Sequence, residues 1–389
     1  MGGPEMAPHS AQAKGATPPS DSPGPRSARP GEAVPRLDAH EGEGPEMARG
    51  APRDAACILQ VSELRTHYFT FGGTRVVKAV DGISFTLREG ETLGLVGESG
   101  SGKTTACLSI VGLLPRAARI VSGSVLFEGE ELTSKSQRQL RRIRGRRIAV
   151  ILQDPMASLN PLFTIFRQVA EPAFFHQRLR GRSLRERVQH LLHAVRIPSP
   201  KWRMREYPHQ MSGGMRQRIV GAIALAGGPR LIIADEPTTN LDVTIQAQYL
   251  ELLQDIQRET GVALIFVTHN LGIVAKMCDR VAVMYAGKIV EQAPVRELFD
   301  APRHPYTRAL LGSVPRLGSK EPLYSITGQP PNLANLPPGC AFHPRCPEAL
   351  PRCATEEPGD FPRGDGRVAR CWLLDGENEA VVARGRTRS

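Results

Sequence analysis

The stretch TLGLVGESGSGKTT, residues 92–105, decides the fold of this chain. It opens with an apolar run of strand length, passes through a glycine-rich loop of the pattern G-x-x-x-x-G-K-[ST], and continues into residues that suit a helix. Glycines in such a loop let consecutive backbone N–H groups turn inward around phosphate oxygens, and the helix N-terminus adds the positive end of its dipole. The stretch therefore predicts a phosphate-binding loop at the end of a buried strand.

Two side chains of this loop have chemical tasks. We expect Lys103 to reach the β and γ phosphates of a nucleotide, and the Thr104 hydroxyl to ligate Mg²⁺. A glycine-rich loop alone is often only a turn, so the prediction depends on an acidic site later in the chain. The candidate nucleotide-binding residues of the loop are Gly97, Ser99, Gly100, Ser101, Gly102, Lys103, Thr104 and Thr105.

Three further apolar runs have the length of strands that are buried on both faces of a sheet. They are RIAVIL (147–152), RLIIAD (230–235) and ALIFVT (263–268). One face of a helix predicted between the last two runs, and ending at Gly261, carries Ile245, Tyr249, Leu252, Leu253 and Ile256. Strands that alternate with helices predict an α/β fold with a mostly parallel sheet. Residues from about 154 to 228 are predicted to be mainly helical, as an inserted subdomain.

Polar side chains follow these runs at the carboxyl edge of the predicted sheet, where ligands collect in open α/β folds. We expect Asp235 to hold Mg²⁺, directly or through water, and Glu236 to polarise an attacking water. His269 is assigned to the γ-phosphate, and Gln153 to Mg²⁺ or the attacking water. The alternatives are a solvated strand end for the carboxylates and a structural role for the histidine. The phosphate loop upstream favours the catalytic interpretation.

A second anion site is predicted in MSGGMRQR, residues 211–218. Ser212, Gly213 and Gly214 precede a run that suits a helix, so bare backbone amides are offered at a helix N-terminus. A capped helix without a ligand is the alternative. A chain with two phosphate-type sites, one of them inside a helical insertion, suggests that the second site serves another copy.

The bulk composition leaves the function open. The chain has 389 residues, a formal net charge of +11 and a pI of about 9.6, which suits anionic partners. No stretch approaches the run of about eighteen apolar residues that spans a bilayer, and we expect a soluble, cytoplasmic protein. Residues 1–55 are rich in Pro, Gly, Ala and Ser and are predicted to be a disordered tail. The basic run at 138–147 lacks interleaved aromatic residues and is interpreted as a solvated helix face.

Four cysteines gather near the C-terminal end, at Cys340, Cys346, Cys353 and Cys371. Their spacing matches neither zinc ribbons nor bacterial ferredoxins. Cytosolic thiols stay reduced, so a metal centre explains the group better than disulfides do. Ligand chemistry allows Zn²⁺, with His343 as a possible substitute for one sulfur, and a [4Fe–4S] cluster. The other cysteines, at 57, 107 and 278, stand singly in apolar settings and are expected to be buried.

The ordered motifs GESGSGKTT, LQD, MSGGMRQR, LIIADEPTTNLD and VTHN resemble those of ATP-binding-cassette (ABC) ATPases. Further stretches, among them QDPMASLNPLF, HPYTRALL and the cysteine-bearing end, resemble the oligopeptide/dipeptide importer subfamily. The resemblance implies a RecA-like parallel sheet with antiparallel β and helical subdomains. It places the ATPase domain at residues 56–300, with a helical subdomain at about 154–228. It also implies a small domain with the four cysteines at 301–389.

The resemblance also implies roles for residues. Two cassettes would pair head to tail, so that ATP on Lys103 of one meets Ser212 to Gly214 of the other. Asp242 corresponds to the loop across the dimer, and Tyr68 to the aromatic residue that stacks on adenine, with Phe69 and Phe71 as competitors. The loop that begins at Gln153 would contact membrane partners, and the cysteines would favour the iron–sulfur cluster over zinc. Asn240, Met211 and Met215 depart from the commonest motifs without removing a catalytic group.

The function implied by the resemblance is an ATPase that energises peptide import, with ATP and Mg²⁺ as cofactors. Its expected partners are two transmembrane permeases, a second cassette and an extracytoplasmic substrate-binding protein, at the cytoplasmic face of the cell membrane. Nucleic acid is not expected. The cargo stays open among dipeptides, longer peptides, nickel chelates and glutathione-like molecules. A soluble ABC ATPase acting on ribosomes or DNA is the alternative, and an inactive scaffold is disfavoured by the intact Glu236.

Overall fold

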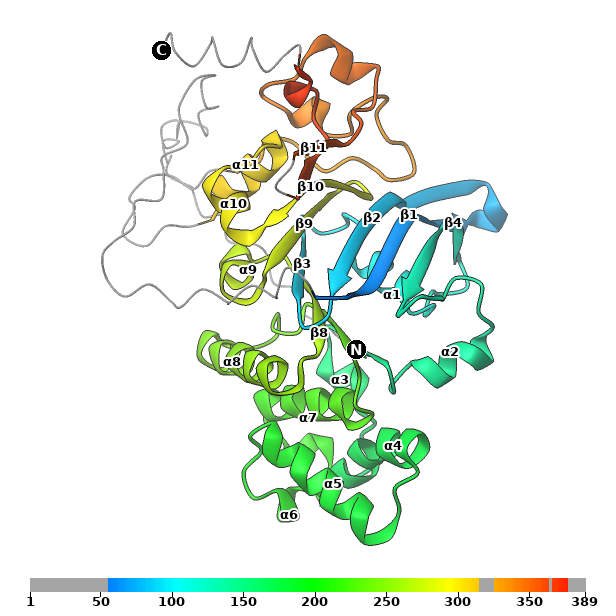
Figure 1. Cartoon of the computed structure of the whole chain (residues 1–389), viewed down its shortest axis with the longest axis vertical. Helices are drawn as coiled ribbons and strands as arrows, with labels where there is room; N and C mark the ends of the chain where they lie inside the picture. Colours follow the sequence, from blue (N-terminus) through cyan, green and yellow to red (C-terminus); the bar gives the residue numbers. More distant parts are fainter. Residues whose placement is uncertain (1–54, 315–324, 364–365, 377–389) are drawn as a thin grey trace, which may run out of the picture. The chain divides into compact units, whose positions relative to one another are not determined.

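The computed structural model describes residues 55–314, 325–363 and 366–376. The tail predicted at residues 1–55 lies, except for its last residue, outside these ranges. All described residues fall within one compact unit, residues 36–389. They form two β-sheets and a set of helices (Figure 1).

The larger sheet contains the four apolar runs as buried, parallel strands. These are β3 (Thr92–Val96), β6 (Ile148–Ile151), β7 (Leu231–Asp235) and β8 (Ala263–Thr268). They lie in the order β3-β8-β7-β6, and every residue of β3, β7 and β8 is buried because both faces are covered. The structure confirms the parallel α/β sheet. It also brings the carboxyl ends of all four strands to one edge.

Further strands extend this sheet beyond β3. β9 (Arg280–Tyr285) runs parallel to β3, and β10 (Lys288–Pro294) pairs antiparallel with β9. β12 (Arg367–Ala369) and β11 (Phe361–Arg363) complete the order β11-β12-β10-β9.

The smaller sheet is antiparallel and has the order β2-β1-β4-β5. Its strands are β1 (Cys57–Thr70), β2 (Arg75–Arg88), β4 (Ala118–Phe127) and β5 (Glu130–Glu131). A core that includes Leu59, Ile83 and Phe127 of this sheet packs with Ala106 and Ile110 of α1 (Lys103–Ile110). This core holds the helix that follows the phosphate loop against both sheets. Cys57 is exposed at the start of β1, whereas Cys107 and Cys278 are buried as expected.

Between β6 and β7 every regular element is helical. The elements are α3 (Pro155–Ser158), α4 (Ile165–Gln177), α5 (Gly181–Ala194), α6 (Pro200–Arg203), η2 (Pro208–Gln210) and α7 (Gly213–Ala226). Figure 1 shows α4 to α7 gathered together, and α4, α5 and α7 share one apolar core with α8. α8 (Val243–Thr260) is capped by Asp242 and ended by Gly261 in the left-handed conformation. Its expected face is buried except for Ile245, which is half-buried and lies beside Gly214.

Further helices follow β1, β5, β8 and β10. They are η1 (Phe71–Gly73), α2 (Gln137–Ile143), α9 (Leu271–Met277), α10 (Val295–Asp300) and α11 (Pro305–Gly312). Among the residues that the structure describes, no helix combines the length and the hydropathy needed to cross a bilayer.

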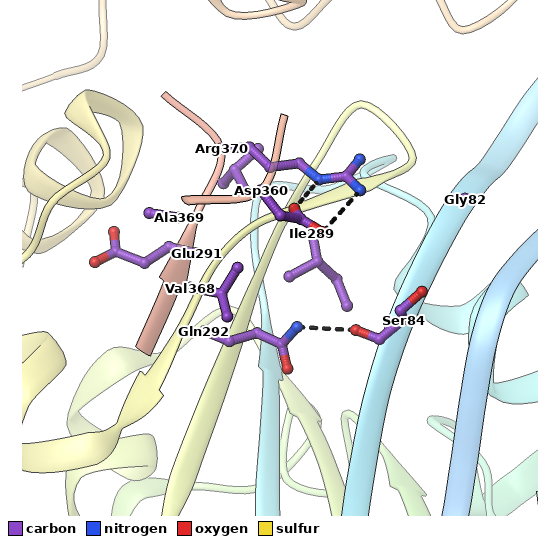
Figure 2. Close-up of a pocket in the computed structure, with 10 residues that line it drawn as sticks. Gly82, Ser84, Ile289, Glu291, Gln292, Asp360, Val368, Ala369 and Arg370 are labelled. Carbon is purple, nitrogen blue, oxygen red and sulfur yellow. Dashed lines mark hydrogen bonds and ion pairs between the residues drawn. The ribbon is translucent and has the colours of Figure 1, made fainter. Parts of the chain in front are cut away.

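The described residues 325–376, called here the C-terminal segment, do not form a separate compact domain. They hold the short helices η3 (His343–Arg345), η4 (Pro351–Ala354) and η5 (Trp372–Leu374). β12 of this segment pairs with β10 of the main sheet. Figure 2 shows this junction, where Arg370 pairs with Asp360 and the Gln292 side chain donates to the Ser84 carbonyl at 2.8 Å. The expected independent C-terminal domain is therefore not confirmed, because backbone pairing continues the main sheet.

Candidate functional site

The phosphate loop joins β3 to α1, and Lys103 is folded back into it. The Lys103 ammonium donates to the carbonyls of Gly97 at 2.8 Å and Glu98 at 2.9 Å. Burial lowers the pKa of Lys103, while the nearby carboxylates Glu236 and Asp235 oppose that shift. A buried ammonium held by two backbone carbonyls is a cation that can turn to a phosphate oxygen.

Two glycines of the loop are required by the space around them. Gly97 has φ +151°, and a Cβ on it would lie 2.2 Å from the Met284 carbonyl oxygen. Gly102 has φ +103°, and its Cβ would lie 2.1 Å from the Ala79 carbonyl oxygen. Because both obstacles are backbone atoms, no side chain fits there. The loop is therefore pressed against β2 and β9, in a backbone conformation that only glycine allows at these two positions.

Asp235 ends β7 beside the start of α1. Its carboxyl accepts a hydrogen bond from Thr104, and its Oδ1 atom is buried without a hydrogen-bond partner among the described residues. Burial raises the pKa of Asp235, although the Thr104 bond and Lys103 pull it down. An orphaned carboxylate oxygen next to a threonine hydroxyl is an oxygen donor set of the kind Mg²⁺ prefers. Thr104 and Asp235 thus fit that ion, whereas the contact that the structure gives Gln153 is to Glu236.

Glu236 joins side chains from three strand ends. Its Oε2 atom accepts from Gln153 Nε2 at 3.0 Å and from the Thr239 hydroxyl at 3.0 Å. Its Oε1 atom lies 3.4 Å from His269 Nδ1. Glu236 has φ +45°, a strained value for a non-glycine residue, and such strain gathers at functional sites. The structure therefore brings Gln153, Glu236 and His269 together at the edge where the sequence predicted them. Thr239, which the sequence analysis did not single out, is a fourth member.

The second predicted anion site forms the start of α7. The Ser212 side chain caps this helix by accepting from Met215 N at 3.3 Å. A Cβ on Gly214 would lie 2.6 Å from Ile245 of α8, so glycine keeps the two helices close. In the described part of the chain no hydrogen bond or ion pair joins Ser212, Gly213 or Gly214 to the phosphate loop. Asp242 caps α8 by accepting from Ile245 N at 2.9 Å.

The aromatic candidates differ in their surroundings. Tyr68, near the end of β1, is half-buried, and its hydroxyl lies 3.4 Å from the Thr105 hydroxyl of α1. Phe69 stacks under the Arg119 guanidinium at 4.0 Å, and Phe71 is exposed in η1. Of the three, Tyr68 contacts the helix that follows the phosphate loop, which keeps it our candidate for adenine stacking.

The four C-terminal cysteines lie near one another. The Cys340 amide donates to the Cys353 carbonyl at 2.8 Å. Burial raises the pKa of Cys346 and of Cys371 to about 12 each, and neighbouring thiols add to both shifts. Among the residues that the structure describes, however, no three His, Cys, Asp or Glu side chains are grouped so that they could hold a metal ion. The metal centre is therefore not confirmed. The His343 ring contacts the Cys340 carbonyl at 2.9 Å.

Sequence reasoning missed the residues that hold the loop from the C-terminal side. The Arg345 guanidinium pairs with the Glu98 carboxylate, and the Tyr306 hydroxyl accepts from the Glu98 amide at 2.9 Å. Partners more than 200 positions apart leave no periodicity or spacing signal. Only the charge of Glu98 inside a loop that binds phosphate could have suggested a compensating cation.

Comparison with known proteins gives two matches to family models. Residues 80–239 match the ABC transporter family, and residues 290–353 match the C-terminal region of oligopeptide/dipeptide transporters. The chain is 48% identical over 330 residues to the dipeptide transport ATP-binding protein DppD of Bacillus subtilis, which is 84% of this chain and 98% of that protein. It is 45% identical over 328 residues to the oligopeptide transport ATP-binding protein OppD of Salmonella typhimurium, which is 84% of this chain and 97% of that protein.

Solved structures show the same fold. An ATP-binding cassette determined as a dimer in a post-hydrolysis state, bound to ADP and Pi, is 27% identical with a TM-score of 0.55. The match covers 61% of this chain and 99% of that one. The cbiO1 protein of Clostridium perfringens, part of an ABC transporter complex, is 29% identical with a TM-score of 0.54, and the match covers 63% and 91%. These likenesses confirm the ATPase cassette as the fold of this chain.

Proposed function

The chain belongs to the ABC transporter family, and from this membership we propose that it hydrolyses ATP to drive the import of peptides. The observation that carries the proposal is the strand edge where Lys103, Asp235 and Glu236 meet, in a chain whose relatives are named as dipeptide and oligopeptide transport ATP-binding proteins. The alternative of a soluble ATPase acting on ribosomes or DNA finds no support among these relatives.

Each residue of the edge has a task in ATP hydrolysis. Loop amides and Lys103 bind the phosphates, and Thr104 with Asp235 would hold Mg²⁺, which neutralises phosphate charge when bound. Glu236 accepts a proton from the attacking water, since one of its oxygens can release Gln153 or Thr239 to take it. Gln153 orients that water, and His269 reaches the γ-phosphate from the end of β8. We retain Ser99, Gly100, Ser101 and Thr105 as further loop contacts.

We propose that two cassettes pair head to tail around ATP. Among the described residues no hydrogen bond joins the start of α7 to the phosphate loop, and we propose that Ser212 and the two glycines after it meet ATP on a second copy. The solved cassette dimer that resembles this chain supports the arrangement. Asp242 would then lie at the dimer junction. The partner is either a second copy or a homologous cassette.

We propose that the permeases dock on a groove beside the Gln153 loop. The groove is lined by Pro161, Leu162, Trp202, Arg205, Glu206, Tyr207, His209 and Gln210. Leu162 is 80% and Trp202 65% exposed, which is unusual for large apolar side chains next to one another. Pro161 and Leu162 of the groove follow Gln153 closely in the sequence, and Gln153 contacts Glu236. A partner seated in the groove could therefore transmit its movement to Glu236. This arrangement places the chain at the cytoplasmic face of the membrane, with a substrate-binding protein on the other side.

The division of the chain is also a proposal. We assign residues 1–55 to a tail, 56–300 to the ATPase domain and 301–389 to a C-terminal extension. The helices between β6 and β7 support a helical subdomain at about 154–228. The ABC transporter match, residues 80–239, falls within the ATPase domain. The match to the C-terminal region of oligopeptide/dipeptide transporters, residues 290–353, falls mainly within the extension.

We propose Cys340, Cys346, Cys353 and Cys371 as ligands of a [4Fe–4S] cluster, with Zn²⁺ as the alternative. The support is the donor set of four thiols, two of which belong to residues joined by a hydrogen bond from the Cys340 amide to the Cys353 carbonyl at 2.8 Å. Among the described residues, no three His, Cys, Asp or Glu side chains are close enough together to bind a metal ion. Iron, zinc and acid-labile sulfide should be measured in the purified full chain. About four irons and four sulfides per chain would identify the cluster, and one zinc per chain would identify the alternative. A purified chain that contains neither iron nor zinc would overturn the proposal.

The function is tested with the variant Glu236→Gln. Removing the carboxylate should lower phosphate release by about 10²–10³-fold while ATP binding persists. Tagged Glu236→Gln, held with ATP and purified from gently solubilised native membranes, should bring down two permeases and a peptide-binding protein. Recovery of ribosomal or DNA-repair proteins without any permease would overturn the importer function. Trp202→Ala in the same background is the matched control, and it should lose the permeases but keep ATP.

A further inference from the structure

The C-terminal segment reaches the phosphate loop through Glu98. Arg345 donates from Nη1 to Glu98 Oε2 at 2.7 Å and from Nη2 to Glu98 Oε1 at 3.1 Å, a two-pronged ion pair. The backbone amide of Glu98 donates to the Tyr306 hydroxyl at 2.9 Å. Both the side chain and the amide of this loop residue are therefore fixed by groups outside the loop.

Arg345 is itself held firmly. Its side chain is 5% exposed, and its Nε atom donates to the Thr327 carbonyl at 2.9 Å. The Arg345 guanidinium lies 5.9 Å from the centroid of the Tyr285 ring. That ring packs in turn against Tyr306 and Phe342, at centroid distances of 4.6 and 5.2 Å. The guanidinium is thus a permanent positive charge in a rigid setting.

The segment is anchored to the cassette at other points, so Arg345 does not depend on Glu98 for its place. The Lys78 amide of β2 donates to the Leu333 carbonyl at 3.1 Å. At the opposite end of the segment, β12 pairs with β10, and Arg370 and Asp360 close the junction shown in Figure 2. A loop residue is therefore attached to a platform that the sheet already supports.

Glu98 matters to the nucleotide in two ways. Its carbonyl is one of the two backbone acceptors of the Lys103 ammonium, so a shift of Glu98 moves the lysine. Its carboxylate stands in a loop that must receive a polyanion, and a negative charge there repels phosphate unless a cation balances it. The ion pair with Arg345 both holds Glu98 in place and balances its negative charge.

We propose that Arg345 is a positioning residue for nucleotide binding, which neutralises Glu98 and fixes the loop carbonyl that holds Lys103. The C-terminal segment is then part of the ATP site without touching ATP. The inference rests on the proposed ATP site. It goes beyond that proposal because it makes ATP affinity depend on the C-terminal segment, which lies outside the strand edge that carries the catalytic residues.

The test is Mg–ATP affinity of the full chain, measured by displacement of a fluorescent ATP analogue. Arg345→Ala should raise the Kd about tenfold, because Glu98 is left charged and unpaired. Arg345→Lys should fall between Arg345→Ala and the wild type. Glu98→Ala combined with Arg345→Ala should return the Kd to within about threefold of the wild type, since the uncompensated charge is gone. Salt should reduce the Arg345→Ala defect by screening the repulsion.

Arg352→Ala is the matched control. Arg352 belongs to the same segment, pairs with Asp375 at 2.9 Å and covers the Trp372 ring at 3.4 Å. Its removal should lower the melting temperature and leave the Kd unchanged. A double variant that binds ATP as weakly as Arg345→Ala would overturn the proposal, and so would wild-type affinity in Arg345→Ala. Failure of the wild-type chain to bind Mg–ATP would instead overturn the proposed function.

Discussion

At the scale of single residues, the site places charged groups where they destabilise the protein until a ligand arrives. Asp235 is the clearest case, because one carboxylate oxygen is buried without a hydrogen-bond partner in the described part of the chain. Lys103 is buried in the same place and satisfied by backbone carbonyls. Binding of phosphate and Mg²⁺ by these groups, as we propose, would therefore oppose stability.

Asp235→Asn should therefore stabilise the nucleotide-free protein while it weakens binding of Mg–ATP. Because burial raises the pKa of Asp235 in the folded state, the folded chain binds this proton more tightly than the unfolded chain does. Stability from this group is present at low pH and lost as the pH rises through the folded pKa. At pH 7 the variant should melt roughly 2–4 °C higher, about 1 kcal/mol in a large domain.

Melting curves at pH 7 and at lower pH check this expectation. The advantage of the variant should shrink as the solution becomes more acidic. A variant that melts lower than the wild type at pH 7 would contradict the sign of the argument.

At the scale of elements, close contact between α7 and the turn before β6 sets the position of the second anion site. Gly227 ends α7, and a Cβ on it would lie 1.6 Å from the Gly145 carbonyl oxygen. The obstacle is backbone, so it cannot rotate away. The start of α7, with Ser212 as its cap, is thus placed by packing at the other end of the helix.

Gly227→Ala should cost about 2–4 kcal/mol of unfolding free energy, because α7 must move away from that turn. Urea unfolding followed by circular dichroism measures the loss. Gly359→Ala is the control, since nothing lies within 4 Å of a Cβ at this exposed position, and it should change stability by less than about 0.5 kcal/mol. Equal effects at the two positions would show that the contact does not constrain α7.

At the scale of the whole molecule, one chain supplies the parts of a site that it does not complete. The phosphate loop and the start of α7 are joined by no described hydrogen bond or ion pair, and both carry anion-binding amides. ATP bound to the loop of one copy is therefore expected to recruit the α7 start of another.

Glu236→Gln with Mg–ATP should accordingly convert a monomer to a dimer, measured by size-exclusion chromatography with light scattering. Ser212→Arg in the same background should remain monomeric, because a bulky cation replaces the cap that faces the second copy. Omission of ATP serves as the control and should leave both variants monomeric. A dimer that forms without nucleotide would contradict ATP-driven pairing. If only a homologous cassette is accepted, the dimer should appear when that homologue is added.

The sequence by itself determined the chemistry and most of the fold. The four apolar runs form adjacent parallel strands, and Gln153, Asp235, Glu236 and His269 lie at one edge. Strands that alternate with helices run parallel, and parallel strands share a carboxyl edge. Local signals also predicted the end of α8 at Gly261, whereas the cap at Asp242 came from the structure.

Only the tertiary structure decided how the C-terminal segment attaches and what it does there. The pairing of β12 with β10 and of Arg345 with Glu98 joins residues far apart in the chain, for which sequence order carries no spacing rule. Cys57, expected to be buried, is exposed for the same reason, since burial depends on which element packs above a side chain. Contacts between residues close in sequence produce a periodic hydrophobic pattern that can be read from the sequence. Contacts between residues far apart in sequence form only in the folded chain and leave no such pattern.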